Sequence, residues 1–456
     1  MNIKLLQKYN KPGPRYTSYP PATFFHDGID MDSYQKMLVQ SNHQKPENIS
    51  IYIHIPFCKQ LCHFCGCNTS CYPGDNFVSR YIDALIQEIQ SVSDLIDTGR
   101  PLTQIHWGGG TPNAISLSFV EKVMKELLSI YKPAAKAEIA MECNPAYLEP
   151  EHINQLAHMG FNRLSLGIQD FNQEVLKLVN RQPSKYPVEQ LIASMKANKM
   201  DGVNIDLIYG LPGQTPDSFR NTIEKAIEIS PDRLVTFSYA HVPWVKSAQK
   251  ILEEIGLPEP EEKLSMFETA YNLLTRNGYE AIGMDHYAKP GDELSVALKN
   301  KKLHRNFQGY CTQETTGQVY AFGATSISQL QGGYYQNIKN HKKYIEAIEQ
   351  TGFATEKGYE LTREDEIRRT IINQIMCNGF LDFDALANEL NTGVAQLKTI
   401  TDYNPEKLKP FADDGLLHID GNRIQLLENG FLVVRNIAME FDPLLSQGKG
   451  QYSKTV

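Results

Sequence analysis

The sequence predicts an α/β protein: an open, partial TIM barrel of six (β/α) units, with an N-terminal arm and a small, mainly helical C-terminal domain. Six apolar, strand-like segments alternate along the chain with segments that have helical periodicity. This alternation is typical of a parallel sheet with helices outside it. Glycine-rich and polar residues directly follow the strand-like segments, at the edge where such barrels place their sites.

The expected elements follow one another in regular order. Strands are expected at 50–56, 103–107, 137–142, 162–168, 203–208 and 233–239, and helices at 77–93, 116–130, 150–159, 172–180, 186–198 and 216–229. Residues 279–284 are a further strand candidate, which would extend the fold toward a full eight-unit barrel. We expect three consecutive parts: an arm with a lead-in helix at 1–48, the barrel with an extension at 49–360, and the C-terminal domain at 361–456.

The C-terminal part begins with Thr362-x-x-Asp365, a pattern similar to a capping box. Helices are expected at 363–377, 382–389, 405–413 and 428–440, with a hairpin over 416–426. This order is similar to a winged-helix domain. No basic recognition helix is visible, so we favour a lid or packing role over DNA binding.

Composition narrows the class of protein. The chain has 456 residues, 41% hydrophobic and 21% charged, which is typical of soluble globular proteins. No stretch reaches the roughly 18 apolar residues of a membrane helix, and no signal peptide opens the chain. The net charge of −8, without a Lys/Arg block, argues against nucleic acid as a partner. We therefore expect a cytoplasmic protein with neither membrane nor nucleic-acid partners.

Cys58, Cys62 and Cys65 form a C-x3-C-x2-C motif directly after the first strand. Three thiolates this close can bind three corners of a cubic iron–sulfur cluster and leave the fourth iron open to a ligand. A structural metal knot is the alternative. Cys67 and Cys71 lie just beyond the motif, and each is a candidate for a bystander, a weak surface thiol or a hydrogen donor.

The motif resembles that of the radical S-adenosylmethionine (SAM) superfamily. The resemblance implies a 4Fe–4S cluster whose open iron takes the amino and carboxylate groups of SAM. It also implies reductive cleavage of SAM to a 5′-deoxyadenosyl radical.

Several strand-end residues fit contacts to SAM. Gly108 to Pro112 let the backbone approach a ligand, and by resemblance contact the methionine amino group. Glu142 ends a strand and Asp206 lies near the end of another, where a carboxylate either caps the next helix or accepts hydrogen bonds from SAM. The SAM-binding residues that we expect are Tyr52, Phe64, Cys67, Gly109, Gly110, Thr111, Glu142, Gln169, Arg181, Asp206, Ile208, Ala240 and Ile327. Among them, Gln169 and Arg181 suit ribose and carboxylate contacts, and Ile208 and Ala240 suit the adenine. Structural capping or core packing remains the alternative for each.

Over nearly its whole length the chain also resembles the oxygen-independent coproporphyrinogen III oxidase family of anaerobic haem biosynthesis. The most specific matches are Pro14-Arg15-Tyr16-Thr17-Ser18-Tyr19-Pro20 and His304-Arg305-Asn306-Phe307-Gln308-Gly309-Tyr310. Other matches are 54–58, 65–68, 106–112, 167–171, 204–212, 239–241 and 283–286. One departure is Asn144, where an acidic residue is expected.

This second resemblance implies that two propionate side chains of coproporphyrinogen III become vinyl groups, giving protoporphyrinogen IX with loss of two carbon dioxide molecules. It also implies two SAM molecules, a monomer, and an electron donor such as a flavodoxin or ferredoxin. The catalytic or substrate residues that we expect are Arg15, Tyr16, Cys67, Arg305, Phe307 and Gln308, with Lys11 as a further cation. Ile327 joins Phe307 and Gln308 at the second SAM. The alternatives are a cluster-containing haem chaperone and another radical SAM enzyme that modifies tetrapyrroles.

Overall fold

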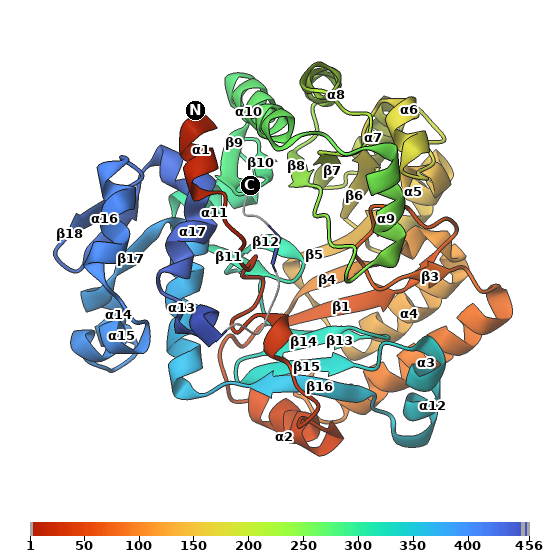
Figure 1. Ribbon diagram of the computed structural model, residues 1–456. Helices are drawn as coiled ribbons and strands as arrows, with labels where there is room; N and C mark the ends of the chain where they lie inside the picture. The colour runs from red at the N-terminus through yellow and green to blue at the C-terminus, as the bar shows by residue number, and fades with distance from the viewer. Residues whose placement is uncertain (1–2, 448–451, 454–456) are drawn as a thin grey trace. The chain divides into compact units, whose positions relative to one another are not determined.

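The computed structural model describes residues 3–447 and 452–453 and divides into two compact units (Figure 1). The barrel unit consists of His26–Pro258 and Glu314–Glu360. The composite unit brings together Met1–Phe25, Glu259–Gln313 and Leu361–Val456. The three consecutive parts expected from the sequence remain a prediction, and residues 1–2, 448–451 and 454–456 of the outer two lie outside the described residues.

Parallel strands form the centre of the barrel unit. In spatial order they are β1 (Ile49–Ile55), β4 (Leu102–Gly109), β5 (Pro133–Cys143), β6 (Arg163–Gln169), β7 (Gly202–Tyr209) and β8 (Arg233–Ser238). The connecting helices are α3 (Asp75–Ser93), α4 (Leu117–Ile130), α5 (Pro150–His158), α6 (Gln173–Leu178), α7 (Val188–Ala197) and α8 (Pro216–Ile229). The predicted fold class is confirmed. β1 pairs with β4 on one edge and with β13 on the other, so β1 does not pair with β8 and the six strands do not close into a full barrel.

The sequence did not reveal how the sheet continues beyond β1. There, β13 (Gln318–Phe322) pairs parallel with β1, and β14 (Ile327–Leu330), β15 (Gly333–Asn337) and β16 (Thr355–Glu360) follow antiparallel. Every residue of β13 and β15 is buried, so neither strand shows the alternation that marks a half-exposed strand. Helices α2 (Met31–Ser41) and α12 (His341–Thr351) belong to the same unit.

Glu88 on α3 is a buried carboxylate that organises this extension. Its oxygens accept hydrogen bonds from Gly323 N at 2.8 Å, Asn337 Nδ2 at 2.5 Å and Tyr344 Oη at 2.6 Å. Burial raises its pKa to about 7 despite these three donors. The carboxylate therefore fixes the turn after β13.

Helices dominate the composite unit. Its described elements are α1 (Ile3–Tyr9), α10 (Pro260–Arg276), β9 (Glu280–Gly283), β10 (His286–Ala288), α11 (Glu293–Lys299), β11 (Leu303–Asn306), β12 (Gly309–Thr312), α13 (Arg363–Asn378), β17 (Phe380–Asp382), α14 (Phe383–Glu389), α15 (Val394–Ile400), α16 (Pro405–Asp413), β18 (Leu417–Asp420), β19 (Arg423–Leu426) and α17 (Val434–Met439). The Thr362 capping box and the β18–β19 hairpin are present as predicted.

Three details of this unit differ from expectation. β9 pairs antiparallel with β10, so it is not a seventh βα strand and the eight-unit alternative is wrong. The helix expected at 428–440 is a 3-10 turn at Glu428–Val433 followed by the short α17. Finally, α15 was not expected. None of the described helices is both long enough and apolar enough to span a bilayer.

The N-terminal arm is packed within the composite unit. Tyr16 and Tyr19 are buried, and their hydroxyls donate to the two oxygens of Asp442 at 2.9 and 3.0 Å. At the start of the arm, Lys8 and Tyr9 both donate to Asp414 at 2.6 Å. Side-chain hydrogen bonds therefore hold the arm at both ends.

We expect Glu88→Leu to lower the free energy of unfolding by roughly 2–4 kcal/mol, because it leaves three buried donors unpaired. Urea titration of the cluster-free protein measures this loss. Glu88→Gln keeps an acceptor oxygen and should cost less. Equal stability of the Leu variant and the wild type would contradict the role assigned to Glu88.

Candidate functional site

The loop that carries the cysteines starts and ends in a two-residue parallel pair, β2 (Phe57–Cys58) and β3 (Ser70–Cys71). On one side, Ser70 N donates to Pro56 O and Tyr72 N to Cys58 O, both at 2.9 Å. On the other side, Gly110 N donates to Ile55 O at 2.8 Å and Thr111 N to Phe57 O at 3.1 Å. The loop, called the cysteine loop below, is therefore anchored at the carboxyl ends of β1 and β4.

The structure brings the three predicted thiols into one neighbourhood, and all three are free. Burial raises the pKa of the Cys58 thiol to about 11, and the nearby Cys65 and Cys62 thiols add to the shift. The pKa of Cys65 lies below its usual value, chiefly because of a hydrogen bond with Cys67. Thr111 Oγ1 donates to Cys58 Sγ at 3.3 Å. Cys67 is therefore a partner of the third thiol of the motif.

The three free thiols on the cysteine loop are suitable ligands for an iron–sulfur cube. Among the described residues, no three His, Cys, Asp or Glu side chains are placed to hold one metal ion. In such a cube each thiolate binds a different iron atom. The three thiols therefore need to be close together but do not need to bind one common ion. Three free thiols on one anchored loop meet that requirement.

The glycines after β4 leave room for the base of the cysteine loop. Gly109 has a φ of +114°, and a Cβ there would lie 2.7 Å from the His54 ring. A Cβ on Gly110 would lie 2.8 Å from the Pro56 carbonyl carbon and 3.1 Å from Cys58 Sγ. Side chains at these positions would push against the loop, so the glycine run has a steric reason here besides its predicted contact with SAM.

Two distant segments also anchor the cysteine loop, and the sequence pointed to neither. Gln60 Nε2 donates to Asn180 O and Oδ1 at 3.0 and 2.7 Å, and Asn180 Nδ2 donates to Leu61 O at 2.8 Å. Beyond β8, in the segment that leads into α9 (Lys250–Ile255), Gln249 Nε2 donates to Phe64 O at 2.9 Å and Lys246 Nζ to Cys67 O at 2.6 Å. Each contact joins residues more than a hundred positions apart, which leaves no local sequence signal.

Predicted polar residues form a row across the strands. The rings of Tyr52 and His106 stack at 6.0 Å, and His106 Nε2 lies 3.0 Å from Glu142 Oε1. Burial lowers the pKa of His106, but the hydrogen bond and charge of Glu142 outweigh it and the net shift is upward. Further along, Asp206 accepts from Ser165 Oγ and Asn204 Nδ2, both at 2.7 Å. Glu142 keeps 43% of its side chain exposed and remains open to a ligand.

Arg181 is held beside the cysteine loop with one donor unused. Its Nη1 donates to Cys62 Sγ at 3.8 Å, and its Nη2 donates to Gly167 O. Its buried Nε has no partner among the described residues. Gln169 ends β6 at a bulge and has a φ of +70°. A guanidinium with a free buried N–H beside the thiols fits the predicted contact with the SAM carboxylate.

The residues expected around the adenine occupy apolar surroundings. Ile208 is buried in a cluster with Tyr239 and Val179, and Phe64 of the cysteine loop packs against that cluster. Gln214, which the sequence did not suggest, donates to Ile208 O at 2.8 Å and to Asp170 Oδ2 at 2.7 Å. Ala240 and Ile327 are partly buried. The loop after β7 is therefore held by a buried amide.

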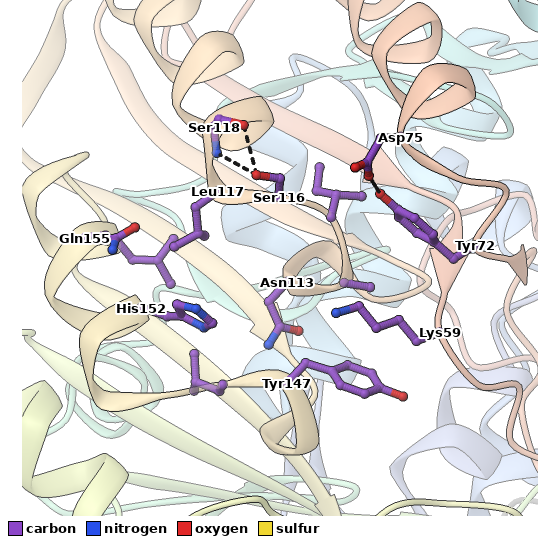
Figure 2. Close-up of a pocket in the computed structure, with 14 residues that line it drawn as sticks. Lys59, Tyr72, Asp75, Asn113, Ser116, Leu117, Ser118, Tyr147, His152 and Gln155 are labelled. Carbon is purple, nitrogen blue, oxygen red and sulfur yellow. Dashed lines mark hydrogen bonds between the residues drawn. The ribbon is translucent and has the colours of Figure 1, made fainter.

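A cavity of about 520 Å³ lies in the barrel unit, and Lys59, the residue after Cys58, is among its lining residues. Figure 2 shows these lining side chains. Lys59 lies over the Tyr147 ring at 5.0 Å, and His152 and Gln155 of α5 also line the cavity. The lining contains no predicted thiol or SAM residue. The cavity is therefore not the site that the sequence predicted.

The remaining predicted residues lie in the composite unit. Arg15 Nη2 pairs with Asp285 Oδ2 at 2.5 Å, and Tyr16 donates to Asp442. Arg305 is buried on β11. Phe307 and Gln308 form the turn between β11 and β12, where Gln308 N donates to Asn306 Oδ1 at 2.9 Å. These residues gather around one hairpin and the arm.

Asn144, the departure from the expected acidic residue, has clear structural partners. Its N donates to Asn113 Oδ1 at 2.9 Å, its carbonyl accepts from Asn113 Nδ2 at 3.0 Å, and its Oδ1 accepts from Ala146 N at 3.1 Å. It joins the loops after β4 and β5.

The open parallel sheet with a three-thiol loop at its carboxyl edge defines the class as radical SAM. The model of the radical SAM superfamily matches residues 52–226, and that of the HemN C-terminal domain matches residues 361–433.

Relatives cover the whole chain. The oxygen-independent coproporphyrinogen III oxidases of Escherichia coli and Synechocystis sp. are 42% and 41% identical over 98% and 99% of this chain and 96% of their own length. The solved structure of the E. coli coproporphyrinogen III oxidase, described as a radical SAM enzyme, matches with a TM-score of 0.89 and 39% identity over 97% of this chain and 98% of that one. The chain belongs to the oxygen-independent coproporphyrinogen III oxidase family.

We expect Cys58, Cys62 and Cys65 to hold the cluster without Cys67. Changing any of the three to Ser should abolish the thiolate–iron absorbance near 400 nm, roughly, after anaerobic reconstitution. Cys67→Ser is the matched control and should keep iron and absorbance. A Cys67→Ser protein without iron would show that the ligand set is wrong.

Glu142→Ala should weaken SAM binding by about 1–3 kcal/mol, because it removes a charge-assisted acceptor at the end of β5. Calorimetry on the reconstituted protein measures the change. Glu149→Ala, at an exposed carboxylate paired with Lys185, is the control. Unchanged SAM affinity in Glu142→Ala would remove Glu142 from the site.

Proposed function

We propose that the chain converts two propionate side chains of coproporphyrinogen III to vinyl groups without oxygen, giving protoporphyrinogen IX and two molecules of carbon dioxide. The observation that carries this is the anchored three-thiol loop in a chain about 40% identical, end to end, to oxidases of that name. The haem-chaperone alternative has no comparable support.

The cofactors are a 4Fe–4S cluster at Cys58, Cys62 and Cys65 and SAM at the strand-end row. When bound, they supply a radical that removes a hydrogen atom from the propionate β-carbon, after which carbon dioxide and one electron leave. Thr111 donates to the Cys58 sulfur and Arg181 to the Cys62 sulfur, and these contacts would orient two of the thiolates that hold the cluster. The free Nε of Arg181 and the exposed side of Glu142 are the groups left to bind the methionine end of SAM.

A second SAM molecule is part of the proposal, with Phe307 and Gln308 among its contacts. Two propionates react, and each needs its own hydrogen abstraction. The buried Gln308 Oε1 has no partner among the described residues, as expected of an acceptor that waits for a ligand. By resemblance we also propose a monomer in the cytoplasm that receives electrons from a flavodoxin or ferredoxin.

Anaerobic reconstitution, followed by mass spectrometry of the products from coproporphyrinogen III, tests the function directly. Protoporphyrinogen formed only when SAM and a reductant are present would support it. SAM cleavage without any vinyl product, together with tight haem binding, would favour the chaperone.

Arg15→Ala tests whether the arm takes part in the reaction or is only structural. Because Arg15 keeps 34% of its side chain exposed while pairing with Asp285, it can also meet a propionate. We expect slower protoporphyrinogen formation and accumulation of the mono-decarboxylated product, with dithionite-driven SAM cleavage retained.

Lys8→Ala, another arm cation with a carboxylate partner, is the control and should react normally. Both decarboxylations at the wild-type rate in Arg15→Ala would show that the arm residue is structural.

A further inference from the structure

A group of charged side chains lies in the composite unit, with Asp285, Arg305 and Arg435 buried and Arg15 partly exposed. Arg15 comes from the arm, Asp285 and His286 from β10 and the residue before it, Arg305 from β11, and Arg435 from α17. Asp285 accepts from Arg15 Nη2 at 2.5 Å and from His286 Nδ1 at 2.8 Å. Arg435 Nε donates to Pro14 O at 3.2 Å, and its Nη2 donates to Gly13 O. Those four side chains have protein partners.

Arg305 differs from its neighbours. It is 3% exposed, and its Nε and Nη1 find no acceptor among the described residues. Its guanidinium lies over the Tyr310 ring at 4.6 Å, and that contact leaves the in-plane N–H groups free. The next residue, Asn306, is 1% exposed and its Nδ2 is also without an acceptor. Buried, unused donors therefore gather at one point.

The charges of the group do not balance. The guanidinium groups of Arg15, Arg305 and Arg435 outnumber the carboxylate of Asp285 in this group. The pKa of Asp285 lies well below its usual value because Arg15, His286 and Arg305 outweigh its burial. Burial lowers the pKa of His286, so the imidazole is neutral at pH 7. Burial, together with repulsion by Arg15 and Arg305, lowers the pKa of Arg435 to about 9. A buried excess of positive charge is costly unless an anion neutralises it.

We propose that the guanidinium of Arg305, with the amide of Asn306, is a buried binding site for the carboxylate of a ligand. The guanidinium can donate charge-assisted hydrogen bonds to carboxylate oxygens from its unpaired nitrogens, and the amide supplies a further donor. The assignment rests on the proposed function, whose ligands offer two such carboxylates: a propionate of the tetrapyrrole and the methionine carboxylate of SAM.

A buried structural arginine in the same protein shows the contrast. Arg100 in the barrel unit is 7% exposed, and every nitrogen donates: Nε to Asp97 O at 3.2 Å, Nη1 to Ser41 O at 3.0 Å and Nη2 to Tyr320 Oη at 2.6 Å. Arg100 stabilises the fold through these bonds. Arg305 has the burial of a structural arginine without its acceptors.

The first experiment compares the thermal stability of Arg305→Met and Arg100→Met without ligands. Methionine keeps an unbranched apolar stem and removes the charge. We expect the Tm of Arg305→Met to equal or exceed that of the wild type, because an unpaired buried cation is removed. The Tm of Arg100→Met should fall. A fall of the same size in Arg305→Met, without loss of ligand affinity, would overturn the proposal.

The second experiment identifies the ligand. Coproporphyrin III and its tetramethyl ester are titrated by fluorescence into the reconstituted protein, and SAM affinity and stoichiometry are measured by equilibrium dialysis. At least tenfold weaker coproporphyrin III binding in Arg305→Met, with the ester unaffected, assigns the site to a propionate. Loss of one SAM equivalent assigns it to the methionine carboxylate. Both affinities unchanged would overturn the proposal.

Arg305→Lys adds a check on geometry, since it keeps the charge and loses the fork, and an intermediate affinity is expected. The results distinguish a failure of the Arg305 site from a failure of the proposed function. Vinyl product from the wild type, with neither ligand dependent on Arg305, refutes the site alone. Arg305-dependent coproporphyrin binding by a wild type that makes no vinyl product refutes the function alone.

Discussion

The candidate site depends on main-chain hydrogen bonds that hold residues 55–58 between two other segments, 70–72 and 110–111. Pro56 and Cys58 carbonyls accept from Ser70 and Tyr72, and Ile55 and Phe57 carbonyls accept from Gly110 and Thr111. On a flexible, exposed loop, three thiols would be open to solvent and to oxidation. Here its first thiol is buried at a strand end, so the position of the other two follows from a short, well-anchored turn.

This anchoring explains much of the chemistry around the loop. The backbone of β2 lies so close to Gly110 that a side chain there would collide with Pro56 and Cys58. Because the loop meets the end of β4 and the segment after α6, Thr111 and Arg181 can both donate to thiol sulfurs. Donors to sulfur favour thiolate, the form that binds iron. The sheet therefore sets the electrostatics of the thiols as well as their position.

The sequence revealed the features with local signals. These features are patterns within short stretches of the chain: the C-x3-C-x2-C spacing, the carboxylates Glu142 and Asp206 at or near strand ends, and the six βα units. Other features depend on long-range contacts or on burial of both faces. Glu88 meets the turn after β13, Gln249 meets Phe64, and β13 is buried throughout. A single polar residue in a helix or loop gives no sequence signal for a partner more than a hundred positions away.

The composite unit contains the two segments that match the oxidase family most specifically, residues 14–20 of the arm and 304–310 of the β11–β12 hairpin. Arg15 of the arm pairs with Asp285, and the same carboxylate interacts with Arg305 of the β11–β12 hairpin. Arg435 of α17 binds the arm carbonyls of Gly13 and Pro14. Removing the arm would therefore leave Asp285 and Arg435 short of partners and change the field at Arg305. Because the arm neutralises Asp285, the charge of Arg305 stays available to an incoming carboxylate, so the two segments form one electrostatic unit.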